Sequence, residues 1–222
     1  MSHGDTVLIL GATGMVGGHA LEHALAHPQV KEVRTLGRRK LAQEHPKLRQ
    51  WVAADLVKLD DEACFQGVTA CLFCVGAYTG ALDSTAFRRI NVDLPLTMAR
   101  ALQRQSPDAR YALLSGQGAD RSEKSRVQFA RDKGAAENQL AALGLGGFAT
   151  FRPGYIYPVV PRKEPNLGYV ISRWIYPLIR RHTKFSIPSD VLAKVMVEVA
   201  LQPMRQEIWE NEDMRRHSVA KG

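Results

Sequence analysis

The chain has 222 residues, of which 45% are hydrophobic and 23% charged, the balance of one ordinary globular domain with its own core. No apolar run approaches the roughly 20 residues of a transmembrane helix, and Met1–Asp5 does not resemble a signal peptide, so we expect a cytoplasmic protein without a membrane partner. The net charge of +8 is spread along the chain without interleaved aromatic residues, which argues against a nucleic-acid partner.

Predicted strands and helices alternate along the chain, which is typical of an α/β doubly wound parallel sheet, the Rossmann fold. The predicted strands are Thr6–Leu10, Glu32–Leu36, Gln50–Ala53, Ala70–Cys74, Arg110–Leu114 and Ala149–Arg152. The predicted helices are Met15–Ala26, Asp60–Phe65, Thr85–Gln105, Val127–Leu143 and Val191–Leu201. We interpret residues 1–222 as one domain. The proline-rich, aromatic stretch 155–188 would form a small C-terminal substrate lobe, with a helix near 169–179.

The three cysteines are interpreted as reduced and buried. Cys71 and Cys74 have CxxC spacing, but both lie in a predicted strand, where positions three apart point to opposite faces. They therefore form neither a disulfide nor a metal site, and no other pattern predicts a metal.

A glycine-rich turn between the first strand and the first helix predicts a dinucleotide site. Gly11 permits the turn, Gly14 lets backbone approach a pyrophosphate, and Gly17 lets the helix pack closely on the sheet. Amides at the helix start then face the phosphates. A turn without a ligand is the alternative. The residues predicted to bind the cofactor here are Gly11, Thr13, Gly14, Met15, Val16 and Gly17.

Several phrases in a fixed order make the chain resemble the atypical branch of the short-chain dehydrogenase/reductase superfamily. It is most similar to the Tat-interacting, oxidoreductase-like group of NAD(P)H-binding proteins, with sugar-nucleotide epimerases as the second choice. The phrases are those at 10–14, 36–40, 54–56, 74–76, 113–115, 118–120 and 151–154.

Arg38 and Arg39 indicate NADP(H) as the cofactor. They lie about 20 residues beyond the glycine turn, where NAD enzymes carry an acidic residue that binds the ribose hydroxyls. Guanidinium groups suit a 2′-phosphate by charge and by paired hydrogen bonds. The alternative is a solvated basic turn.

The resemblance implies further cofactor contacts. Asp55 and Leu56 would lie at the adenine, although Asp55 is equally suited to a turn. Gly76 would pass close to the ribose, and Pro153 would lie beneath the nicotinamide. Asn91 would link the site to backbone and water, unless it is an exposed helical asparagine.

The resemblance also assigns the chemistry to Ser115 and Lys133. Ser115 would bind the substrate carbonyl, and Lys133 would hold the cofactor ribose. The family's Tyr-x-x-x-Lys has Phe129 in place of tyrosine, and phenyl donates no proton. Substituting tyrosine for Phe129 is expected to restore a phenol one helical turn from Lys133. Otherwise the acid would be a water on Lys133 or one of Tyr78, Tyr155 and Tyr157.

Two functions follow. The first is an NADP(H)-dependent oxidoreductase of a small carbonyl or alcohol, with weak or altered catalysis. The second is a non-catalytic NADP(H)-binding sensor or protein-interaction module. The expected partner is accordingly a small-molecule substrate or a protein, and a homodimer is compatible with both.

Overall fold

A seven-stranded, fully parallel sheet forms the centre of the molecule. The computed structural model describes residues 4–59, 61–76, 83–160 and 184–220. The strand order is β3-β2-β1-β4-β5-β6-β9, and each neighbouring pair is parallel. The strands are β1 (Asp5–Leu10), β2 (Val30–Gly37), β3 (Leu48–Val52), β4 (Ala70–Phe73), β5 (Arg110–Leu114), β6 (Gly147–Arg152) and β9 (Ile208–Glu210).

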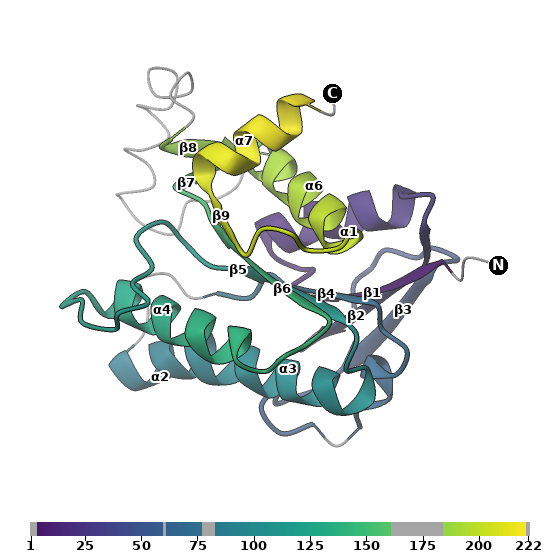
Figure 1. The fold of residues 1–222 in the computed structure, drawn as a ribbon. Coiled ribbons are helices and arrows are strands. Elements are labelled where there is room, and N and C mark those ends of the chain that lie inside the picture. The colour runs from purple at the N-terminus through teal and green to yellow at the C-terminus, as the bar shows by residue number, and fades with distance from the viewer. Residues whose placement is uncertain (1–3, 60, 77–82, 161–183, 221–222) are drawn as a thin grey trace.

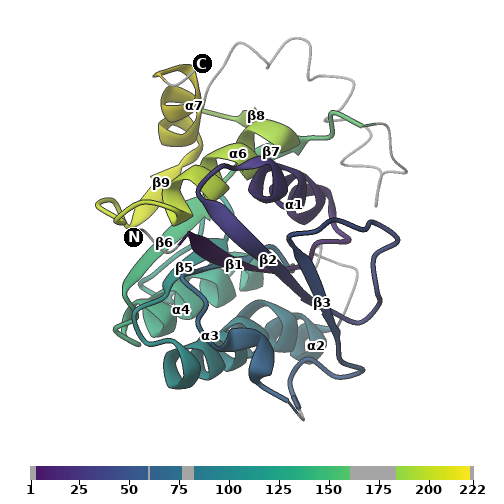
Figure 2. The ribbon, with the colours of Figure 1, turned by 90° about the vertical axis from the view of Figure 1, so that its right-hand side faces the viewer.

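Helices cover both faces of this sheet (Figure 1). Helices α1, α6 and α7 lie on one face, and α2, α3 and α4 on the other, while Figure 2 shows β3 and β9 at opposite edges. The long helices are α1 (Met15–Ala26), α3 (Leu94–Gln105), α4 (Gln128–Ala141), α6 (Ser189–Ala200) and α7 (Asn211–Ala220). The short ones are α2 (Ser84–Arg88), the 3-10 turn η1 (Ala63–Phe65) and the π-turn η2 (Arg89–Asp93).

The strand order creates a switch point beside β1. The chain runs outward from β1 to β2 and β3, then crosses over to β4 on the other side of β1. Loops leaving the carboxyl ends of β1 and β4 therefore diverge. The crevice between diverging loops is where open α/β sheets bind their ligands. The glycine turn after Leu10 and the loop after Phe73 flank this crevice.

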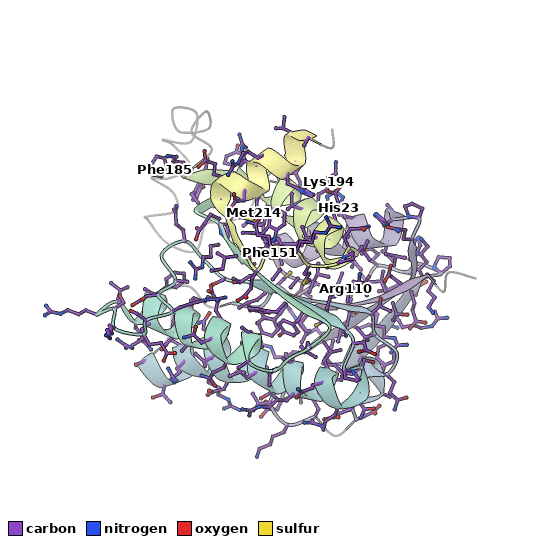
Figure 3. The ribbon with its side chains drawn as sticks, viewed as in Figure 1. His23, Arg110, Phe151, Phe185, Lys194 and Met214 are labelled. Carbon is purple, nitrogen blue, oxygen red and sulfur yellow. The ribbon has the colours of Figure 1, made fainter. Side chains whose placement is uncertain are left out.

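Each face of the sheet has its own hydrophobic core, because strands covered on both faces bury nearly every side chain. In β1, Val7 and Ile9 point to one core, and Leu8 and Leu10 to the other. Phe151 of the sheet belongs to the core under α6 and α7, and Figure 3 shows Met214 of α7 on that same side.

The predicted elements are largely confirmed. All six predicted strands are present within about two residues, and α1 begins and ends as predicted. The predicted helix over residues 60–65 is wrong in extent, since within residues 61–65 only the single turn η1 forms. The sequence analysis missed β9 and α7. Among the described residues, the structure contains no helix with the length and apolar character to cross a membrane.

The helix predicted over residues 85–105 is interrupted by a π-turn. The Leu94 amide donates to the Arg89 carbonyl, five residues back, and Pro95 follows at the start of α3. Because proline has no amide hydrogen, it cannot bond the Asn91 carbonyl as an α-helical residue would. The wider π-turn accommodates the absence of this hydrogen bond, and such turns are frequent at functional sites.

The predicted lobe is described only at its two ends. Strands β7 (Tyr155–Tyr157) and β8 (Ser186–Pro188) pair in parallel as a separate two-stranded sheet. The helix expected near residues 169–179 lies outside the described residues.

Gly17 is required by the close approach of α1 to the turn before it. A β-carbon on Gly17 would lie 2.1 Å from the Gly11 carbonyl oxygen, whereas one on Gly18 would lie 3.5 Å from the Ala12 carbonyl oxygen. We expect Gly17→Ala to lower the free energy of unfolding by about 1–3 kcal/mol through overpacking. Gly18→Ala, the matched control, should raise it by about 0.5–1 kcal/mol through helix propensity. Urea denaturation measures both, and equal stabilities would contradict this packing.

Candidate functional site

A cavity of about 520 Å³ opens at the switch point of the sheet. It is lined by the start of α1, the loops after β4, β5 and β6, and side chains from η2 and α4. It brings together seven of the predicted site residues: Gly14, Met15, Val16, Gly76, Ser115, Lys133 and Pro153. The predicted residues that do not line it are Gly11, Thr13, Gly17, Arg38, Arg39, Asp55 and Leu56.

The glycine turn has the backbone geometry predicted for it. Gly11 has φ of +87°, and a β-carbon there would lie 2.8 Å from the Cys74 carbonyl oxygen. The Gly14 amide donates to the Gly11 carbonyl at 2.8 Å and closes the turn. Gly14 is exposed immediately before α1, so the first helical amides face the cavity without a helical partner.

The basic pair and Asp55 follow β2 and β3 and do not line the cavity. Arg38 and Arg39 directly follow β2 and are exposed. Asp55 accepts a hydrogen bond from the Val57 amide at 2.9 Å and pairs with Arg89 at 3.2 Å. The turn interpretation of Asp55 is therefore realised in this structure. Its adenine contact, like the phosphate contact of the arginines, stays a prediction.

Ser115 ends β5 at the cavity, but its hydroxyl hydrogen is already engaged. The Ser115 hydroxyl donates to Glu137 Oε1 at 2.7 Å, and both side chains are buried. Glu137 lies on α4, one helical turn beyond Lys133, and was missed by the sequence analysis. Its only signal was a carboxylate among the apolar positions of a buried helix face.

Five hydrogen bonds converge on the Glu137 carboxylate. Besides Ser115, the donors are Thr150 at 3.0 Å, Arg121 at 2.9 Å and two nitrogens of Arg152. Burial opposes the charged form of Glu137. The bonds from Arg152, Ser115 and Arg121 outweigh burial and hold the pKa of Glu137 below its usual value. Glu137 is therefore an ionised carboxylate inside the protein.

Lys133 lies at the same cavity with its ammonium group nearly enclosed. The side chain is 4% exposed, and Nζ donates to the Leu114 carbonyl at 3.3 Å. Burial lowers the pKa of Lys133 to about 8, against a smaller opposing effect of Glu137. An ammonium has three donors, so two further donors of Lys133 are available beside the Leu114 bond.

Phe129 occupies the place predicted for the family tyrosine, at the start of α4 and on the cavity wall. Its ring tip faces Gly116: a β-carbon there would lie 2.5 Å from Phe129 Cζ and 3.3 Å from Cε1. A hydroxyl added at Cζ would meet the Gly116 backbone. The expectation that tyrosine at this position restores a well-placed phenol therefore does not hold without movement of the loop.

Asn91 is buried at the cavity, so the exposed alternative is wrong. Its Nδ2 donates to the Phe87 carbonyl at 3.0 Å, which fixes the orientation of the amide. Oδ1 is buried and has no hydrogen-bond partner among the described residues. The π-turn η2 thus holds this acceptor inside the protein, at a residue that lines the cavity.

The turn at Pro153 and Gly154 is held by the C-terminal part of the chain. The Gly154 amide donates to Asn211 Oδ1 at 2.9 Å, and Asn211 Nδ2 donates to the Ser186 carbonyl at 2.9 Å. Asn211 is 1% exposed and begins α7. The sequence analysis missed this residue because β9 and α7 were not predicted.

Cys71 and Cys74 are both free thiols; Cys71 is buried as predicted, whereas Cys74 is only partly buried. Burial raises the pKa of Cys74 to about 12, which keeps this cavity-lining thiol protonated.

Comparison with known proteins gives similarity along nearly the whole chain. Residues 6–92 match the family model "Semialdehyde dehydrogenase, NAD binding domain". Mitochondrial protein fmp52 of Aspergillus clavatus is 31% identical, with 91% of this chain and 89% of that protein covered. Protein HTATIP2 of Rattus norvegicus is 28% identical, with 93% and 86% covered.

Solved structures share the fold at low identity. MoeE5 in complex with UDP-glucuronic acid and NAD has a TM-score of 0.69 and 19% identity, over 93% of this chain and 75% of that one. A putative NAD-dependent epimerase/dehydratase from Bacillus halodurans has a TM-score of 0.65 and 16% identity, over 96% and 100%. The predicted Rossmann fold is confirmed.

The expected cytoplasmic location is wrong in the light of these relatives. The names of the fungal proteins, including that of Emericella nidulans at 29% identity, place them in mitochondria. The expectation rested on the absence of a secretory signal, which does not distinguish the cytosol from an organelle.

The buried ammonium of Lys133 predicts a pH-dependent stability. Lys133 loses its proton near pH 8 in the folded state and near 10.5 in the unfolded state. Between these values the unfolded state binds more protons, so folding gains stability as the pH rises. The free energy of unfolding of the wild type, relative to Lys133→Met, should increase from about pH 8 to 10.5. Urea titrations at several pH values measure it. The control Lys58→Met, at an exposed position, should show the same pH dependence of the free energy of unfolding as the wild type. The same pH dependence in Lys133→Met would contradict the prediction.

Proposed function

Because the chain belongs to the NAD(P)-binding, short-chain dehydrogenase/reductase-like oxidoreductase family that includes Fmp52 and HTATIP2, we propose that it is an NADP(H)-dependent oxidoreductase. Its substrate would be a small carbonyl or alcohol. The single observation that carries this proposal is the cavity itself, where the start of α1 meets Ser115 and Lys133 at the switch point of the sheet.

The preference for NADP(H) over NAD(H) is supported by the end of β2. Two exposed guanidinium groups, of Arg38 and Arg39, stand where an acidic residue would accept from the ribose hydroxyls of NAD. Neither is engaged in an ion pair within the described residues. Both are therefore available for an additional phosphate, which guanidinium binds by charge and by paired hydrogen bonds.

The residues around the cavity would divide the work between binding and orientation. When bound, the cofactor supplies hydride transfer at its nicotinamide. The first amides of α1 would bind the phosphates, and Gly76 and Pro153, which line the cavity, would contact the ribose and ring. Lys133 would bring donors to the ribose, and Ser115 would fix the position of the substrate oxygen.

The proton must come from a group other than residue 129. Of the tyrosines considered from the sequence, Tyr155 lines the cavity and Tyr157 does not, while Tyr78 lies outside the described residues. Lys133 also lines it and carries a pKa of about 8, close to the range in which general acids work best. Tyr155 and Lys133 are thus the two candidate acids.

A non-catalytic NADP(H)-binding protein is the second candidate function. The observation that favours it is Phe129, whose ring packs against Gly116 at the cavity without a proton to donate. Such a protein would bind cofactor and signal its presence to a protein partner. Both candidates require the same cofactor site, so turnover alone distinguishes them.

The arginine pair predicts the cofactor preference. Wild type should bind NADPH at least about tenfold more tightly than NADH, because charge-assisted hydrogen bonds contribute about 1.5–3 kcal/mol each. The double variant Arg38→Ala/Arg39→Ala should lose this preference and bind NADH as before. Titration calorimetry measures all four affinities. Arg100→Ala, which removes an exposed charge from α3, is the matched control and should keep the preference. Equal NADPH and NADH affinities in the wild type would exclude the NADP(H) assignment.

The packing of Phe129 predicts the outcome of restoring tyrosine. A well-placed donor to a developing oxyanion is worth about 10²–10³-fold in rate. Because the new hydroxyl would meet the Gly116 backbone, we expect Phe129→Tyr to raise NADPH-dependent carbonyl reduction by less than about tenfold. NADPH affinity should stay within about twofold, since no phosphate contact changes. A panel of small aldehydes and ketones, followed by NADPH absorbance, measures it.

Comparison with Ser115→Ala separates the two candidate functions. If the wild type turns over a carbonyl and Ser115→Ala is slowed while still binding NADPH, the protein is an enzyme. If the wild type is inert and Phe129→Tyr gains a hundredfold or more, the protein is a cofactor binder and the packing argument at Gly116 is wrong.

A further inference from the structure

We infer that the site binds an alcohol oxygen in preference to a carbonyl oxygen, because Ser115 meets the ligand as a hydrogen-bond acceptor and Lys133 meets it as a donor. This inference rests on the proposed function and names the substrate class within it. It concerns recognition of the ligand before any reaction.

The first step is the direction of the Ser115 bond. A serine hydroxyl has one hydrogen and two lone pairs, whereas an ionised carboxylate only accepts. Glu137 is ionised, so the 2.7 Å contact uses the single Ser115 hydrogen. Ser115 lines the cavity, and toward a ligand there its hydroxyl can then offer only lone pairs. A carbonyl oxygen has no hydrogen to give them, but an alcohol has one.

The second step is that Ser115 cannot easily turn its hydrogen toward the cavity. Doing so would remove one of five hydrogen bonds from a fully buried carboxylate. Groups buried in the protein lose more by an unmade bond than exposed ones, because water does not replace the lost partner. Arg121 and Arg152 also hold Glu137 in place, so the carboxylate does not follow a rotating hydroxyl.

The third step is the donor. Lys133 Nζ binds the carbonyl of Leu114, the residue directly before Ser115, and both Lys133 and Ser115 line the cavity. The inference places a remaining hydrogen of Lys133 within reach of the same ligand oxygen as the Ser115 hydroxyl. An oxygen between the two receives a hydrogen from Lys133 and gives one to Ser115. A secondary or primary alcohol satisfies both. A ketone oxygen can accept a hydrogen from Lys133, but it has none to give to Ser115, so the ketone oxygen and the Ser115 oxygen face each other as two acceptors.

The test measures binding without turnover. The protein is saturated with tetrahydro-NADP, a cofactor analogue that cannot transfer hydride, and its binding is verified by calorimetry. Dissociation constants of two matched pairs, cyclohexanol with cyclohexanone and 1-phenylethanol with acetophenone, are then measured by ligand-observed NMR. The alcohol of each pair should bind about three- to tenfold more tightly, which is the contribution of one neutral hydrogen bond.

Three variants identify the source of that preference. In Glu137→Gln, the amide oxygen in place of Oε2 keeps the bonds from Arg121 and Arg152, and the NH₂ group in place of Oε1 faces Ser115, Thr150 and Arg152 Nε. Ser115 then accepts from this NH₂ group and its own hydrogen is free, so the ratio should fall to one or reverse. Ser115→Ala removes the acceptor and should also reduce the ratio to one, by weakening the alcohol alone. This variant keeps the test valid if Glu137→Gln does not fold. Thr150→Val, the matched control, removes another donor to Glu137 away from the cavity and should keep the ratio.

Each remaining outcome overturns the inference. Ketones that bind as tightly as alcohols, binding of neither member of a pair, or an unchanged ratio in Ser115→Ala would show that Ser115 does not select the ligand as an acceptor. Failure of tetrahydro-NADP to bind would instead overturn the proposed function, and the inference with it. The calorimetric step therefore distinguishes the two failures.

Discussion

The ionised carboxylate of Glu137, enclosed between the sheet and α4, is the interaction on which the candidate site depends. A buried charge is tolerated only when hydrogen bonds and opposite charges replace its water. Here five donors do so, and they come from the ends of β5 and β6 and from the loop before α4. Removing one partner of such a pair costs about 3–5 kcal/mol, so these segments keep a fixed relation to one another. The same carboxylate sets the direction of the Ser115 hydroxyl.

The network also links the cavity to the last strand of the sheet. Arg121 pairs with Glu207 at 2.6 Å, and Arg152 pairs with Glu210 at 3.1 Å, beside or within β9. Directly after β9, Asn211 bonds the Gly154 amide in the turn that lines the cavity. The C-terminal elements are therefore a structural support of the site, although none of their residues lines it. Bonds to buried backbone groups are among the costliest to lose, which makes Asn211 a rigid anchor.

The parts of the fold that could be predicted from the sequence are those with a local sequence pattern. The buried runs of β1 and β4 and the glycine spacing after β1 are local signals, and these elements were predicted at their observed places in the chain. The partners of Glu137 could not be predicted, because Arg121, Thr150 and Arg152 lie 13 to 16 residues away in the chain and meet only through the sheet. Strand β9 is three residues long, too short for an alternating pattern, and the π-turn depends on the exact position of Pro95. Local patterns thus predict elements, whereas long-range polar contacts decide what the site can do.

Phe129 and Ser115 both affect which hydrogen-bond donors the cavity offers. The ring of Phe129 has no hydrogen to donate, and the bond to Glu137 engages the single hydrogen of the Ser115 hydroxyl. In the proposed oxidoreductase, both features would leave the substrate oxygen without a donor from these two residues. Lys133, which lines the same cavity, is then the donor proposed for that oxygen. A serine that meets the ligand as an acceptor is suited to a ligand that brings its own hydrogen, and an alcohol is the simplest such ligand for an oxidoreductase fold.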